Sequence, residues 1–294
     1  MDHEAAATST SLGLDAALAG LHRRYGAAAV RRGGDPVARS TWPTGVPALD
    51  TLLPDGGLPC GRLSVLAGEQ AAAGGAVGPT GRLTLLQALT AAASREAQVA
   101  YLDLAGSLDP GFLVDLGADL EACLVVRPPA GSMAAGLAMA RALVRAGVPW
   151  LAVGLGRERP RGGGTALDHA LTALVGMVEG ARAVACVAAP MPLPAPLAYA
   201  SSLTVACRSL GWQEAHGDVT GLRVGLRVVK SKLAAPGGEA ALLLRYPRPQ
   251  AAAEVVGLPT VAPAPVAPVP ALAPLPEEAD DGAALGQAAA AMGH

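Results

Sequence analysis

Apolar runs of strand length alternate with helix-like segments through the middle of this chain, and this alternation constrains its fold more than any other feature. The runs that we expect to form strands lie at residues 63–67, 99–104, 150–153 and 183–187. The segments that we expect to form helices lie at residues 83–93, 113–116, 134–146 and 166–178. Strands that alternate with helices in this way pair in parallel, with helices on both faces of the sheet.

Three further apolar runs, at residues 203–207, 222–230 and 241–246, follow one another without a helix between them. Consecutive strands without a crossover helix pair antiparallel. We therefore predict an α/β core over residues 41–247, with a mainly parallel sheet, helices on both faces and an antiparallel extension.

The residues before this core predict a short amphipathic helix over 12–25. Leu14, Leu18, Leu21 and Tyr25 recur at helical spacing, and a Gly-Gly-Asp-Pro break follows. This apolar stripe packs either on the chain's own core or on a neighbouring subunit. We treat residues 1–40 as a separate N-terminal segment that makes subunit contacts.

The composition changes after Pro247, where proline and alanine dominate and no pattern of a packed core remains. We predict a disordered tail over residues 248–294. Its acidic cluster, Glu277 to Asp281, is either solvated or an electrostatic competitor for a basic surface.

Composition excludes several classes of function. A hydrophobic fraction of 51% argues against a disordered chain, and a net charge of −2 argues against a strongly basic nucleic-acid binder. The four cysteines and five histidines lack metal-ligand spacing, so no metal is expected. The longest uncharged stretch, residues 183–207, contains four prolines, so we expect no membrane span and a cytoplasmic protein.

Five segments, all in the same order, resemble the bacterial recombinase family RecA. They are LDAALAGLHRRYGAAAVRRGGD (14–35), STWPTGVPALDTLLPDGGLPCGRLSVLAG (40–68), AYLDLAGSLDPGFLVDLGADLEACLVVRPP (100–129), LAYASSLTV (197–205) and LRVVKSKLAAP (226–236). The resemblance implies the RecA-like core of a P-loop NTPase over about residues 12–247. The Pro-rich tail stands where the family has a C-terminal domain. Proteins of the ImuA type, RecA relatives associated with mutagenic lesion bypass, are a second similar group.

The resemblance places a phosphate loop after the strand at 63–67, but its residues depart from the family motif. A working loop needs G-x-x-x-x-G-K-[ST], whose lysine reaches the phosphates and whose hydroxyl binds Mg²⁺. The residues that align with this motif are Gly78, Gly81, Arg82, Leu83 and Thr84. Arg82 stands at the lysine position and Leu83 at the hydroxyl position, and Thr84 replaces the hydroxyl only after a register shift.

Three further positions that the family uses for ATP hydrolysis are apolar here. Ala105 stands at the glutamate that activates water, Gly154 at the metal-associated aspartate, and Ala189 in the polar sensor after the next strand. We therefore expect a pseudo-ATPase with no catalytic residues and no cofactor.

Part of the family's adenine pocket matches Asp109, Phe112 and Tyr246. These residues either keep weak binding of an adenine nucleotide or form only an Asp-Pro turn and two packed aromatic rings.

Lys230 and Lys232 are the chain's only lysines and share one face of a predicted strand. The matching pair of the family reaches the ATP phosphates of a neighbouring subunit. The resemblance thus implies binding to a RecA protomer, and a solvated strand end is the alternative.

Arg157, Arg159 and Arg161 alternate in the segment that matches the family's first DNA loop, just before three glycines. The segment is either a weak, salt-sensitive contact to single-stranded DNA or a solvated surface loop.

These observations predict a non-catalytic accessory protein of DNA repair, recombination or damage-induced (SOS) mutagenesis, located at the nucleoid. Its expected partners are RecA or a RecA-like protomer, an error-prone lesion-bypass polymerase and single-stranded DNA. The alternatives are an active DNA-dependent ATPase with a diverged loop, and a structural protein that self-assembles through the N-terminal helix.

Overall fold

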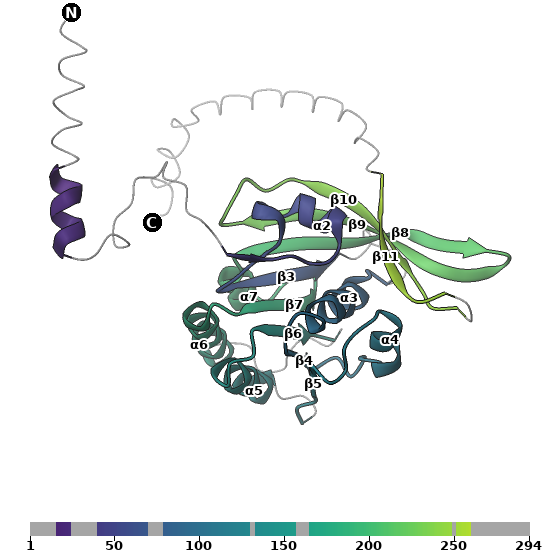
Figure 1. The fold of residues 1–294 in the computed structure, drawn as a ribbon, viewed down its shortest axis with the longest axis horizontal. Helices are drawn as coiled ribbons and strands as arrows, with labels where there is room; N and C mark the ends of the chain where they lie inside the picture. Colours follow the sequence, from purple (N-terminus) through teal and green to yellow (C-terminus); the bar gives the residue numbers. More distant parts are fainter. Residues whose placement is uncertain are drawn as a thin grey trace, which may run out of the picture. The chain divides into compact units, whose positions relative to one another are not determined.

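The computed structural model describes residues 16–24, 40–69, 79–129, 133–156, 165–248 and 251–259, with the backbone alone for 165–167. In this part of the chain nine strands form one sheet in the order β11-β10-β9-β8-β3-β7-β6-β4-β5 (Figure 1). The strands are β3 (Arg62–Gly68), β4 (Val99–Asp103), β5 (Cys123–Val126), β6 (Trp150–Gly154), β7 (Val184–Pro190), β8 (Leu203–Ala215), β9 (Asp218–Ser231), β10 (Glu239–Arg245) and β11 (Glu254–Leu258). The helices that follow residue 40 are α2 (Pro47–Leu52), α3 (Arg82–Ser94), α4 (Pro110–Asp115), α5 (Met133–Arg145), α6 (Thr165–Ala181) and α7 (Ala195–Ala200).

The six strands from β8 to β5 run parallel, as the alternation of apolar runs predicts. The sheet lies between α3 on one face and α5 and α6 on the other (Figure 1). Leu85 and Leu89 of α3 pack with Tyr101 and Trp150 of the sheet in one core. Leu137 of α5 belongs to the second core, on the opposite face.

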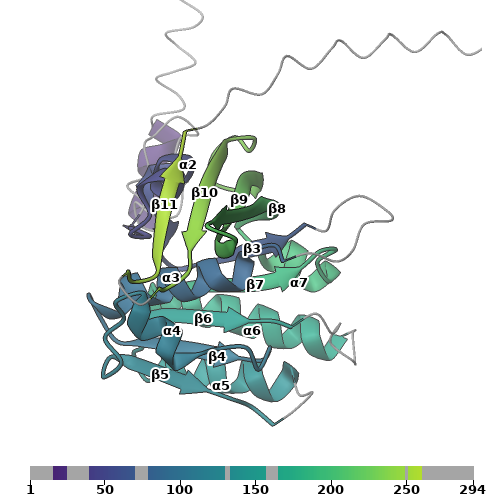
Figure 2. The same ribbon diagram turned by 90° about the vertical axis from the view of Figure 1, so that its right-hand side faces the viewer.

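The antiparallel extension comprises β9, β10 and β11, of which β9 pairs with β8. Residues 208–214 of β8 are exposed, so the β8–β9 hairpin continues beyond the packed core. Figure 2 shows β10 and β11 side by side, next to α2. The predicted start of the tail at residue 248 was wrong, because β11 adds one more paired strand to the core. Its five residues are too few, and too close to proline, to stand out as a strand in the sequence.

The short elements before the sheet complete the core. β1 (Thr41–Trp42) pairs antiparallel with β2 (Leu58–Pro59), and the 3₁₀ turn η1 (Pro54–Gly56) lies between α2 and β2. Residues 16–24 form a helix that contains Leu18 and Leu21, whereas Leu14 and Tyr25 lie outside the described residues. None of the helices in the described ranges is long and apolar enough to cross a membrane.

Candidate functional site

The residues predicted to mark a lost ATPase site gather at the carboxyl ends of the parallel strands. Ala188 of β7 pairs with both Leu66 of β3 and Gly154 of β6, and Gly154 pairs with Asp103 of β4. α3 begins directly beside the end of β3. In open α/β sheets ligands bind at this edge.

Gly81 places the first turn of α3 close to the antiparallel strands. Its φ of +74° lies in the left-handed region that glycine favours. A Cβ atom here would lie 2.5 Å from Val224 Cγ2 and 2.9 Å from Leu244 Cδ1. This glycine therefore has a packing role, in addition to its match with the phosphate-loop motif. Gly78 lies outside the described residues.

The Arg82 side chain turns back over the end of β3 and binds protein oxygens. Its Nη1 donates to Thr80 Oγ1 at 3.3 Å and its Nη2 to the carbonyl of Leu155 at 3.2 Å. A Cβ atom at Gly68 would lie 2.9 Å from Arg82 Cδ, so the arginine lies directly on the strand end. Arg82 thus joins the end of β3 to the residue after β6, at the place where the motif has its phosphate-binding lysine.

Tyr101 fills the space beside Gly154. A Cβ atom at position 154 would lie 2.8 Å from the Tyr101 hydroxyl and 3.4 Å from Leu83 Cδ2. The hydroxyl is buried without a hydrogen-bond partner in the described structure. Burial and the nearby Asp103 carboxylate raise the pKa of Tyr101 well above its ordinary value, so the phenol stays neutral. No room remains for an aspartate side chain at this position.

Another polar group of this edge, the Asp103 carboxylate, bonds to neighbouring groups of the protein. Its carboxylate accepts from the amides of Ser107 and Leu108 at 3.1 and 3.2 Å and pairs with Arg127 at 3.2 Å. Ala105 lies shortly after the end of β4, and its Cα atom would be 3.5 Å from a Cβ atom added to Gly156.

Two other predicted positions also lie near this edge. Ala189 is fully buried at the end of β7. Thr84 lies half-buried in the first turn of α3. The described residues contain no group of three potential metal ligands.

The three residues that match an adenine pocket have local partners. Asp109 caps α4, because its Oδ1 accepts from the Gly111 amide at 2.8 Å. Tyr246 lies beside Trp212, with ring centroids 6.4 Å apart, and burial raises its pKa. Phe112 is half-buried in α4. Asp109 thus forms the predicted turn and Tyr246 lies against another ring, while both interpretations of the three residues stay predictions.

Lys230 and Lys232 both point to the carboxyl end of α7. The Lys230 ammonium donates to the carbonyl of Ala198 and to Ser201 Oγ, the latter at 3.3 Å. Lys232 donates to the Tyr199 carbonyl at 2.9 Å and lies 5.3 Å from the centre of that ring. Burial, and then the neighbouring Lys232, lower the pKa of Lys230. The pair therefore caps a helix end, where cations are favourable.

The predicted DNA loop with Arg157, Arg159 and Arg161 lies outside the described residues. A different basic surface, which the sequence analysis missed, lies on the β8–β9 hairpin. We call it the arginine face; its exposed members are Arg208, Arg223 and Arg227, arranged around Gly225. The signal that could have found it is the repeat Gly-Leu-Arg-Val-Gly-Leu-Arg over residues 221–227, which places glycine and arginine alternately on one side of a strand.

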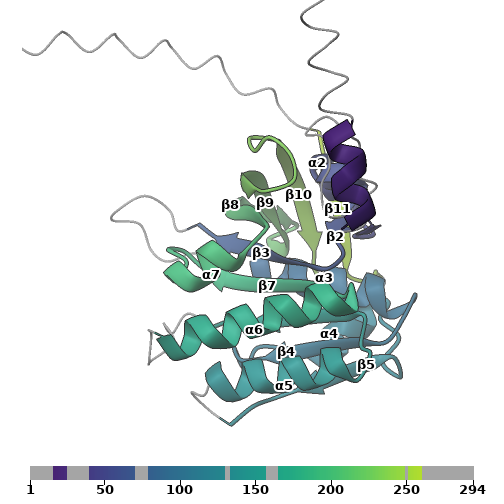
Figure 3. The same cartoon turned by 90° about the vertical axis from the view of Figure 1, so that its left-hand side faces the viewer.

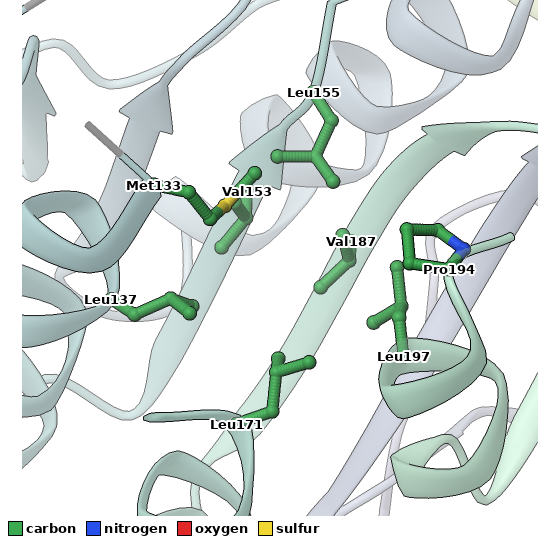
Figure 4. Close-up of a pocket in the computed structure, with 8 residues that line it drawn as sticks. All are labelled: Met133, Leu137, Val153, Leu155, Leu171, Val187, Pro194 and Leu197. Carbon is green, nitrogen blue, oxygen red and sulfur yellow. The ribbon is translucent and has the colours of Figure 1, made fainter. Parts of the chain in front are cut away.

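A small apolar pocket lies between α5, α6, α7 and the ends of β6 and β7. Figure 4 shows its lining, which includes Leu137, Val153, Leu171 and Leu197. Its lining has no charged side chain, so it does not suit a phosphate group.

Comparison with known proteins relates the N-terminal half of the chain to one family. The sequence profile of the RecA N-terminal domain matches residues 12–153. The protein RecA of Streptomyces ambofaciens is 37% identical over 147 residues, which are 48% of this chain and 36% of that protein. That of Streptomyces coelicolor is 36% identical over 145 residues, with the same two shares. That of Kineococcus radiotolerans is 36% identical over 137 residues, 46% of this chain and 36% of its own length. The matching region thus spans about a third of these relatives.

Proposed function

We propose, on the premise that residues 12–153 place this chain in the RecA family, that it is a non-catalytic accessory protein of DNA repair or recombination. It acts by binding a RecA protomer and single-stranded DNA. It does not hydrolyse ATP.

One observation carries the non-catalytic part of this proposal. The Tyr101 hydroxyl and Leu83 occupy the space in which a side chain at position 154 would lie, within 2.8 and 3.4 Å of its Cβ. Metal-dependent phosphoryl transfer needs a carboxylate near the metal and a cation free to reach the phosphates. Here position 154 has neither a carboxylate nor space for one. Arg82 donates to Thr80 and Leu155, and these contacts support the proposal.

The arginine face supports the proposed contact with single-stranded DNA. Phosphate contacts from arginine give salt-sensitive binding that does not depend on base sequence. In the part of the chain that the structure describes, α5, α6 and α7 lie in front of the parallel strands, whereas β8 to β10 continue beyond them (Figure 3). Because few aromatic side chains are available for stacking, we expect weak binding.

The partner in this proposal is a RecA protomer, which the chain meets through the end of β9 and α7. Tyr199 of α7 is 81% exposed and lies beside Lys232. Tyrosine is among the residue types that dominate binding energy at interfaces, and the Lys232 ammonium adds a charge beside this ring. Lys232 and Tyr199 together therefore form the proposed contact.

Replacing both lysines with alanine (Lys230→Ala and Lys232→Ala) is expected to weaken capture of Streptomyces coelicolor RecA filaments by about tenfold or more, since charge-assisted contacts contribute roughly 1.5–3 kcal/mol each. The matched control is the double arginine variant (Lys230→Arg and Lys232→Arg), which keeps both charges and should bind nearly as well as the natural chain. Thermal melting of all three proteins checks that α7 stays folded. Equal capture by the alanine and natural chains would rule out this contact.

A further inference from the structure

We infer that Glu69 is a built-in competitor for polyanions on the arginine face, pairing with Arg227 until a phosphate backbone displaces it. This inference rests on the proposed function, because it concerns regulation of the proposed DNA surface. The proposed competitor pair joins Glu69, which directly follows β3 and begins the phosphate-loop segment, to the arginine face on β9.

The arginine face is one continuous surface. Arg208 of β8 pairs in register with Gly225 of β9, and a Cβ atom on Gly225 would lie 3.1 Å from Arg208 Nε. Arg223 and Arg227 flank this glycine on the same side of β9. Residues 222, 224 and 226 point the other way, into the core. Because Gly225 has no side chain, the Arg208 side chain can lie across β9 at this position, which places its guanidinium group near Arg223 and Arg227.

Glu69 is held in position at the edge of this face. Its amide donates to the carbonyl of Cys207 at 2.8 Å, which extends the pairing of β3 with β8 by one residue. Its Oε1 lies 3.1 Å from Arg227 Nη2. The Glu69 side chain is 27% exposed and that of Arg227 is 51% exposed, so the arginine is the more accessible member of the pair.

The other two arginines of the face differ from Arg227. Within the described ranges Arg208 and Arg223 take part in no ion pair, so their charges are available to a ligand. Glu239 lies directly across from Arg227 in the sheet, yet no ion pair joins the two side chains. Glu69 is therefore the carboxylate that pairs with the third cation of the face.

An exposed ion pair of this kind is weak, with a typical contribution of about 0–1 kcal/mol to stability. A phosphate group can therefore displace Glu69 from Arg227 at modest cost. Because Glu69 must first leave Arg227, the arginine face binds a phosphate backbone less tightly than it would with three unpaired arginines.

The test measures binding of a labelled thymidine oligonucleotide to the full chain by fluorescence anisotropy across a salt series. Glu69→Gln is expected to bind about fivefold more tightly at low salt, with a log-log salt slope steeper by about 0.7, because one more cation contacts the single strand. Glu239→Gln is the matched control: it removes a carboxylate opposite the same arginine without breaking an ion pair, so its gain should be clearly smaller. In an Arg227→Gln background, Glu69→Gln should no longer change the affinity.

The failures of the inference and of the DNA proposal are distinguishable with the double variant Arg208→Gln and Arg223→Gln. If this variant loses binding while Glu69→Gln binds like the natural chain, or gains no more than Glu239→Gln, the competitor role is overturned and the DNA surface stands. If neither the natural chain nor Glu69→Gln binds the oligonucleotide, both proposals fall.

Discussion

A carboxylate introduced by Gly154→Asp is expected to lower the free energy of unfolding by about 3 kcal/mol or more, and to create no ATP turnover. The added Cβ atom would lie 2.8 Å from the Tyr101 hydroxyl, closer than side chains tolerate. The site is also buried, so the new charge loses water without gaining a prepared set of donors. Urea unfolding measures the stability change, and a phosphate-release assay measures turnover.

A double-mutant cycle assigns this cost to Tyr101. Gly154→Ala adds only the Cβ atom and should lose about 2 kcal/mol, as overpacked cores do. Tyr101→Phe removes a buried hydroxyl without a hydrogen-bond partner, so this change alone should be nearly neutral. Together the two changes should cost at least about 1 kcal/mol less than their sum. If Gly154→Asp is as stable as the natural chain, position 154 is open and the account of this edge is wrong.

The second large effect is expected at Gly81, where Gly81→Val should cost about 4 kcal/mol. Part of this loss comes from the left-handed backbone, which costs a residue with a Cβ atom about 1–2 kcal/mol. The rest comes from packing, because the new side chain would meet Val224 and Leu244 of the antiparallel strands. Small domains have about 5–15 kcal/mol of stability, so the variant should unfold at far lower urea concentration.

Gly106→Val is the matched control for the Gly81 variant. Gly106 also has a positive φ, of +62°, but a Cβ atom there would have nothing within 4 Å. Its valine variant should therefore show only the backbone cost. If both variants lose the same free energy of unfolding, the contacts of the start of α3 with β9 and β10 contribute nothing to stability.

Much of the fold follows from local sequence, because long apolar runs report buried parallel strands directly. β5 was missed: it is an edge strand of four residues whose side chains are largely exposed. The outer half of β8 was missed for a related reason, because residues 208–214 pair only with β9 and have no apolar pattern from a core. α7 was missed because prolines precede it, although proline suits the first turn of a helix.

The candidate site depends on contacts between distant parts of the chain, which sequence patterns do not reveal. The departures from the family's ATPase residues, including Arg82 in the phosphate loop and Gly154 at the aspartate position, are visible in the sequence. That Tyr101 occupies the space at Gly154 is visible only in the structure, as is the bond from Arg82 to the carbonyl of Leu155. The pairing of Glu69 with Arg227 joins residues 158 positions apart.

In our proposal, the same contacts stabilise a RecA-like core that carries out no ATP chemistry. In an enzyme the edge would hold polar groups ready for a ligand, whereas here Arg82 and Asp103 bond to the protein itself. Such bonds stabilise the fold without a ligand, because buried polar groups need partners. In our proposal, function then rests on surfaces: the arginine face and the end of α7.

ATP turnover by the purified chain, with and without single-stranded DNA, tests the central claim most directly. We expect no phosphate release above that of a protein-free control, and no difference between the natural chain and Arg82→Ala. DNA-stimulated turnover that disappears in Arg82→Ala would contradict the account, since Arg82 would then act on a nucleotide in a working phosphate loop.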